Sequence, residues 1–184
     1  MRLSSAVLIL VSISVVPLAA QSADPLRYEV AAGYQFMRDQ DIAKQNPDLS
    51  ANFPAGWMAS GGARLWGWLD AVGEVSGSMK TLSIPGDKPK LRVLTYMAGP
   101  RFERAAHPGI NPFAQVLFGS ARASNTVLGI RETVTDFSYQ PGGGIDLNLA
   151  RRFGARLEGD YRIVRAGGHN SKEPRVVAAA VIGF

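Results

Sequence analysis

The sequence of 184 residues contains no cysteine and only two histidines, His107 and His169. Without cysteine the chain can form no disulfide, and it offers no thiolate as a nucleophile or metal ligand. Two histidines leave little for an imidazole metal site. We therefore expect no metal site and no cofactor, and the fold must depend on packing and hydrogen bonds.

Charged residues and long apolar runs are also scarce. Charged residues make up 19% of the chain, and the 20 Lys and Arg residues behind its net charge of +5 are spread along it rather than grouped. A nucleic-acid-binding surface is therefore not expected, because such surfaces concentrate basic residues. Beyond residue 20 no apolar run approaches the ~18 residues that indicate a membrane helix.

The N-terminal segment has the pattern of a secretory signal peptide. Arg2 supplies a positive charge, an apolar stretch follows, and small residues up to Ala20 precede polar ones. We expect residues 1–20 to be the signal peptide and residues 21–184 to be the exported domain. A membrane anchor is the alternative, but the apolar stretch is short and Pro17 ends it.

The exported domain alternates apolar and polar residues with a period of two, which is typical of β-strands with two different faces. The pattern is clearest where Phe153, Leu157 and Ile163 alternate with charged residues. One segment is apolar on both faces, with Gln115 as the only indication of its orientation. Eight strands are predicted, at residues 28–36, 57–66, 69–79, 93–102, 112–121, 139–149, 153–163 and 174–184.

Long and short connections largely alternate between these predicted strands. An even number of antiparallel strands, with long loops at one end and short turns at the other, is the plan of an outer-membrane barrel. The sequence therefore predicts an all-β fold, an eight-stranded antiparallel up-and-down transmembrane β-barrel. Short turns are expected at 66–68 and 150–152. Surface loops are expected at 38–56, 80–90, 123–136 and 165–173.

The two faces of the strands have different roles in such a barrel. Apolar side chains face lipid, and aromatic ones near the strand ends form girdles at the two interfaces. Polar side chains face a bore that is narrow enough for side chains to fill. An Arg or Lys facing lipid would cost about 2–4 kcal/mol at the midplane. The predicted interior polar ladder consists of Glu29, Arg64, Asp70, Glu74, Arg101, Asp146, Arg156, Glu158, Asp160 and Arg162.

The final strand is apolar on both faces. Its last nine residues are VVAAAVIGF, and those of one face should contact lipid: Val176, Ala178, Ala180, Ile182 and Phe184. The residues between them should line the bore with small apolar groups: Val177, Ala179, Val181 and Gly183.

Three segments carry a family resemblance: TYMAGPRFERAAHPGINPFAQVLFGSARA (95–123), GGGIDLNLARRFGARLEGDYRIVR (142–165) and the terminal VVAAAVIGF. Together they resemble the outer-membrane β-barrel domain family of OmpA-type and OmpX-type small barrels, over nearly all of the exported domain. The resemblance implies location in the cell outer membrane, contact with outer-membrane lipid, and reading of Phe184 as an assembly signal by the barrel-assembly machinery. It does not include a peptidoglycan-binding domain, so no role in tethering the cell wall is expected.

One short arrangement hints at catalysis. His169 and Ser171 form a His-x-Ser pair, which outer-membrane lipid A deacylases use. The pair falls in a predicted polar loop, and no acid follows Glu173 to orient the base that a nucleophilic Ser needs. His107, beside Pro108, is predicted as a turn residue. We therefore predict a non-enzymatic barrel with an envelope-structural role or a role for its surface loops.

Three alternatives stay open from the sequence. A soluble periplasmic lipocalin-like ligand-binding barrel has the same alternation turned inside out. Alternating loop lengths, together with many small residues on the apolar faces, favour the membrane barrel over it. The other two alternatives are an outer-membrane lipid-modifying enzyme and a narrow pore.

Overall fold

The computed structural model describes residues 28–38, 52–81, 90–104, 109–127, 130–166 and 169–184. These residues form the strands β1 (Tyr28–Arg38), β2 (Asn52–Phe53), β3 (Ala55–Trp66), β4 (Leu69–Thr81), β5 (Lys90–Glu103), β6 (Ile110–Val127), β7 (Ile130–Asn148), β8 (Phe153–Ala166) and β9 (His169–Gly183). Among them no helix is long and apolar enough to cross a membrane. The predicted signal peptide lies outside the described residues.

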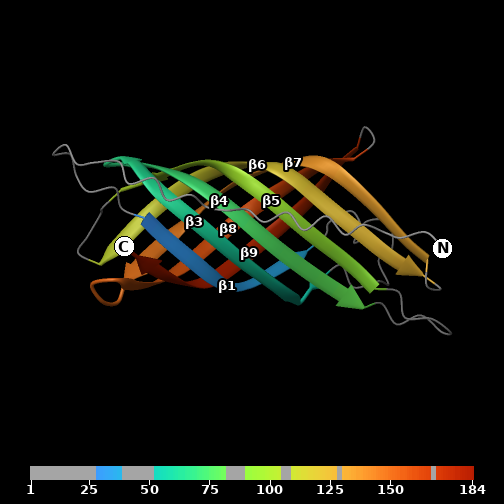
Figure 1. The fold of residues 1–184 in the computed structure, drawn as a ribbon, viewed down its shortest axis with the longest axis horizontal. Coiled ribbons are helices and arrows are strands. Elements are labelled where there is room, and N and C mark those ends of the chain that lie inside the picture. Colours follow the sequence, from blue (N-terminus) through green and yellow to red (C-terminus); the bar gives the residue numbers. More distant parts are fainter. Residues whose placement is uncertain (1–27, 39–51, 82–89, 105–108, 128–129, 167–168) are drawn as a thin grey trace, which may run out of the picture.

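The strands pair antiparallel in chain order and close into a barrel (Figure 1). β1 pairs with β3 on one side and with β9 on the other, from Glu29↔Gly183 to Met37↔Arg175. β2 has only two residues and pairs with the end of β1. Eight long strands therefore form the wall, which confirms the predicted eight-stranded antiparallel barrel. Closure gives every strand two neighbours, as a sheet in lipid requires.

The two ends of the barrel differ. At the turn end, where Phe184 lies, tight turns join β3 to β4 and β7 to β8, near the predicted positions. The register shifts between Arg64 and Trp66, and the ring of Trp68 stacks on that of Phe102 with centroids 5.8 Å apart. The opposite end, called the loop end, carries the β1–β3, β4–β5, β6–β7 and β8–β9 connections.

Two predicted loops are wrong, because the strands continue through them. β6 and β7 stay paired up to Val127↔Ile130, inside the predicted loop 123–136. β8 and β9 likewise cover most of the predicted loop 165–173. Both faces of these extensions are rich in polar residues. The sequence therefore shows no apolar–polar alternation there, although the backbone hydrogen bonds between the strands continue. Two other predicted loops fall largely outside the described residues: 38–56 and 80–90.

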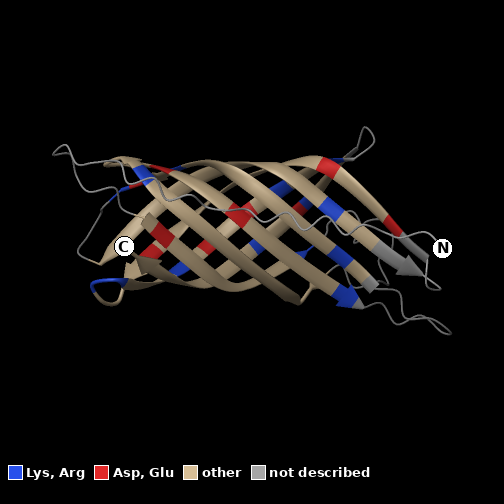
Figure 2. Cartoon of the chain, in the orientation of Figure 1, with Lys and Arg blue, Asp and Glu red and all other residues tan. Residues whose placement is uncertain are grey.

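The outer wall is apolar, and most charged strand residues follow the buried, inward alternation of their strands. Figure 2 marks the positions of the charged residues along the strands. This distribution is the reverse of a lipocalin-like barrel, whose apolar face lines its cavity. Tyr161 shares the outward face and is half-buried. Other aromatic side chains on the outward faces of the strands are exposed: Tyr28, Tyr34, Phe36, Trp57, Tyr96, Phe102 and Phe153.

β9 has two apolar faces in the structure. Val176 is 60% exposed on the outside, whereas Val177 is fully buried. Val177 and Ala179 pack inside the barrel against Ala31 and Met58. This part of the bore is thus lined by apolar groups. The charged groups occupy other parts of the interior.

Candidate functional site

The interior polar ladder is the candidate functional site, since the charged groups of the strands gather there. All ten predicted residues form ion pairs within the barrel. Glu29 and Arg64 are half-buried, and the other eight are buried. The structure separates the ten into two clusters and one further arginine, which lie at successive levels of the bore.

The first group, called the turn-end cluster, is held by forked arginine contacts. Arg156 donates from Nε and Nη2 to the two carboxylate oxygens of Asp146, each at 2.7 Å. Its Nη2 also contacts Glu29 Oε1 at 2.8 Å, and Arg101 pairs with the same oxygen. Two-point arginine–carboxylate contacts fix orientation as well as distance. The members are Glu29, Arg64, Asp70, Arg101, Glu103, Asp146 and Arg156.

An aromatic ring and an amide extend this cluster toward the middle of the barrel. The guanidinium carbons of Arg101 and Arg156 lie 4.7 and 5.0 Å from the ring centroid of Phe113, within the range of cation–π attraction. Gln115 accepts from Arg101 Nε at 2.9 Å and donates to Glu158 Oε1 at 2.9 Å. One glutamine therefore joins the two clusters.

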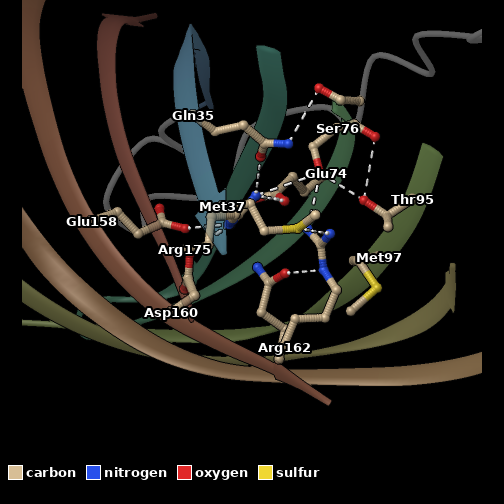
Figure 3. Close-up of polar contacts among 12 residues, drawn as sticks. Gln35, Met37, Glu74, Ser76, Thr95, Met97, Glu158, Asp160, Arg162 and Arg175 are labelled. Carbon is tan, nitrogen blue, oxygen red and sulfur yellow. Dashed lines mark hydrogen bonds and ion pairs between the residues drawn. The ribbon is translucent and has the colours of Figure 1, made fainter. Parts of the chain in front are cut away.

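The second group, called the central cluster, surrounds Arg175 (Figure 3). Its guanidinium contacts Glu74 at 2.6 and 3.0 Å, Asp160 at 2.6 and 3.0 Å, and Glu158 at 2.9 Å. It also donates to Gln35 Oε1 at 2.9 Å. These residues come from β1, β4, β8 and β9, so a single cation ties opposite sides of the wall together.

Arg162 lies beyond the central cluster, on the loop-end side. Its Nε donates to Gln140 Oε1 at 3.0 Å, and its Nη2 donates to Ser76 Oγ at 3.1 Å. Its Nη1 lies 3.7 Å from Glu173. Ser76 is in turn 2.6 Å from Thr95 Oγ1. The hydrogen-bonded interior therefore continues across β4, β5, β7 and β8.

Apolar side chains fill much of the remaining bore. Leu117 is fully buried, and it packs with Val72 and Met97. Met37 is also fully buried, and its sulfur lies 3.6 Å from Arg162 Nη1. Toward the turn end the bore opens into a polar hollow of about 580 Å³, lined by both signs of charge.

Sequence reasoning missed Arg175, the best-connected residue of the site. The signal was present: alternation backward from the inward-facing Val177 places Arg175 and then Glu173 on the inner face. Both are buried there. The apolar run at the end of β9 dominates its sequence pattern, and Glu173 falls within the predicted loop at 165–173. Three interior glutamines were also left out of the predicted ladder: Gln35, Gln115 and Gln140.

The candidate catalytic pair does not lie in a loop. His169 is the first residue of β9, and Ser171 pairs with Val164 of β8 inside the ladder. The prediction that this pair occupies a polar loop is therefore wrong, because the β8–β9 ladder continues through this segment. His107 lies outside the described residues.

A closed antiparallel sheet with an apolar outer wall and a polar interior defines the class of eight-stranded outer-membrane β-barrels. Several solved structures share this fold. Neisserial surface protein A has a TM-score of 0.65 at 14% identity, over 89% of this chain and all of its own. Ail, the attachment invasion locus protein of Yersinia pestis, has a TM-score of 0.60 at 16% identity, over 86% of this chain and 99% of its own. The N-terminal barrel domain of Pseudomonas aeruginosa OprF has a TM-score of 0.57 at 12% identity, over 86% and 97%.

These similarities establish the fold, and the chain has the architecture of the small OmpA/OmpX-type barrels. No protein-family model matches the sequence, and no curated protein matches it. At 12–16% identity the likeness lies in the barrel itself. What the protein does must therefore be argued from its own residues.

Proposed function

We propose that this chain is a small, non-enzymatic outer-membrane β-barrel that contributes to envelope structure and carries paired strands beyond the membrane at its loop end. One observation carries the proposal: the wall is apolar outside, while buried ion pairs and apolar side chains fill the interior. Such a molecule is suited to lipid on every side. Its interior favours a structural role over transport.

Export and orientation complete the proposal. Residues 1–20 act as a signal peptide, and residues 21–184 form the exported barrel domain. Outer-membrane barrels place short turns on the periplasmic side and longer connections outside the cell. The extended β6–β7 and β8–β9 hairpins at the loop end would then face the exterior. They are the surface through which we expect any contact outside the cell to occur.

The decisive experiment is gel mobility of the detergent-extracted protein with and without boiling, combined with membrane fractionation. A closed membrane barrel resists unfolding in the unheated sample and migrates differently from the boiled chain. We expect this difference in the outer-membrane fraction. Recovery of the protein without detergent in the periplasmic fraction would instead support the soluble ligand-binding alternative.

The filled interior leads to a prediction about conductance. Because Leu117, Met37 and the central cluster fill the bore, we expect no steady ion current from the folded wild-type protein in planar lipid bilayers. A matched preparation with Arg156→Ala and Glu158→Ala, checked for barrel mobility, shows whether removing interior groups opens a path. A steady current from the wild-type barrel would contradict this prediction and favour a narrow pore.

We also propose that Phe184 is an assembly signal read by the barrel-assembly machinery. Its side chain is 67% exposed at the turn end, and its N–H donates to the carbonyl of Tyr28 at 2.8 Å. Deleting Phe184 removes one backbone hydrogen bond, worth about 0.5–1.5 kcal/mol. We therefore expect a large loss of inserted protein in cells and only a small change in the unfolding free energy of the purified barrel.

The control for that deletion is Leu149→Ala, because Leu149 is equally apolar and 72% exposed near the same end. The amount of inserted protein is read from the heat-sensitive band of the outer-membrane fraction. Normal insertion of the chain lacking Phe184, or an equal loss with Leu149→Ala, would count against the assembly role.

A further inference from the structure

The charged residues on the strands are sorted by sign between the inside and the outside. Among strand residues whose side chains the structure describes, every Asp and Glu follows the inward alternation. The outward alternation carries only cations, and all of them lie at the loop end: Arg38, Arg92, Arg122, Arg165 and Lys172. Within the described part of the chain none of these five forms an ion pair.

Four of these cations form two diagonal pairs on adjacent strands. Arg122 lies opposite Leu94, so Arg92 is its diagonal neighbour on the same face. Diagonal neighbours of this kind are about 7–8 Å apart, within reach of long side chains. Two arginines at this spacing can approach one anionic group from both sides.

The second pair has the same arrangement on β8 and β9, and β7 separates it from the first pair. Lys172 of β9 lies opposite Ile163 of β8, and Arg165 is its diagonal neighbour. The guanidinium of Arg165 lies 5.6 Å from the ring centroid of Tyr139, which directs this cation along the outer wall. Both pairs therefore belong to the side of the barrel and not to its opening.

The cations begin where the apolar wall ends. Tyr96 is exposed on β5, with Arg92 two outward positions further toward the loop end. Phe118 and Arg122 repeat this order on β6. Aromatic girdles lie at the level of lipid headgroups, and long basic side chains extend from there toward the polar region. In an outer membrane this order would place the cations level with the headgroup phosphates.

We propose that these two cation pairs are binding sites for the phosphate groups of anionic lipids in the leaflet around the loop end. The inference rests on the proposed membrane location. Phosphate matches the chemistry, since arginine binds it with two parallel hydrogen bonds and lysine as a point charge. A lipid source is favoured over a soluble polyanion because the cations continue the outer face of the apolar wall.

The test compares three purified double variants with the wild-type protein. Arg92→Gln with Arg122→Gln removes the first pair, and Arg165→Gln with Lys172→Gln removes the second. The matched control, Arg151→Gln with Arg152→Gln, removes two exposed cations from the β7–β8 turn at the other end. Each protein is equilibrated in detergent micelles that contain phosphatidylcholine and phosphatidic acid, and bound lipids are counted by native mass spectrometry.

We expect the wild-type protein and the control to enrich phosphatidic acid over phosphatidylcholine. Each loop-end variant should reduce that enrichment about twofold or more. Equal enrichment in all four proteins, or an equal loss in the control, would overturn the proposal. Preferential binding of a soluble sulfated oligosaccharide, without phosphatidic acid enrichment, would overturn it in favour of a soluble ligand.

Heat-modifiable gel mobility of each sample distinguishes failure of the proposed lipid sites from failure of the proposed function on which they rest. Heat-modifiable mobility with no enrichment of phosphatidic acid refutes the lipid sites and leaves the membrane barrel standing. A wild-type protein that neither shifts on heating nor enters phosphatidylcholine vesicles refutes the proposed function, and the lipid sites with it.

Discussion

Arg175→Met is expected to destabilise the folded barrel by about 3–5 kcal/mol, the usual cost of removing one partner from a buried ion pair. Arg175 is 1% exposed and contacts the carboxylates of Glu74, Glu158 and Asp160. Without the guanidinium, three buried acids would face one another with no cation among them. Methionine fills a similar volume, so the loss reports mainly on charge.

The measurement is urea-induced unfolding of the barrel reconstituted in lipid vesicles, followed by tryptophan fluorescence and gel mobility. The matched control is Arg151→Met, since Arg151 is exposed in the β7–β8 turn and outside the interior clusters. It should change the unfolding free energy by less than about 1 kcal/mol, as exposed charges usually do. Equal effects of the two variants would show that the central cluster does not hold the barrel together.

A second large effect is expected from Gly33→Ala, at the seam where β1 meets β9. A Cβ atom at this position would collide with the carbonyl oxygen of Ala178 and the Cα of Ala179. These are backbone atoms, so rotation of a side chain cannot relieve the collision. We expect a loss of about 3 kcal/mol in unfolding free energy, at the upper end of overpacking effects, or failure of the barrel to close.

Gly73→Ala is the control for this substitution, because a Cβ there meets nothing within 4 Å. Both variants are expressed, extracted and compared by heat-modifiable mobility and by urea unfolding. Gly73→Ala should behave as the wild type, while Gly33→Ala should show little of the folded band. Wild-type mobility and stability of Gly33→Ala would mean that the β1–β9 seam tolerates separation of its strands.

The period-two alternation was sufficient to predict the barrel, because a membrane wall forces apolar and polar side chains onto opposite faces. Segment 153–163 shows this most clearly, and β8 contains all of it. The strand ends could not be predicted in the same way. The pairing of β6 with β7 continues beyond the apolar wall to Val127↔Ile130. Near this end Glu132 and Thr133, which lie on opposite faces of β7, are both exposed, so no apolar–polar alternation marks the ladder.

The sequence predicts which residues belong to the interior ladder better than it predicts which of them contact one another. Each inward-facing charge follows from its own strand, and backward alternation from Val177 would also have found Arg175. Its partner Glu74 lies on β4, which does not pair with β9, and its partner Gln35 lies on β1, which is next to β9 only because the barrel closes. Such contacts depend on how the strands are staggered around the barrel, and that stagger is a property of the closed sheet.

The pairing of β1 with β9 has a consequence for how the chain folds. Every other pair of neighbouring long strands is close in sequence. The loop between the two strands can therefore close early and at low entropic cost. The seam joins the two ends of the described barrel, and contacts between residues so far apart in sequence are slow to form. Pairing of β1 with β9 is therefore expected to be the last and rate-limiting step of folding. Until it is complete, both strands have unpaired edges that can recruit another chain.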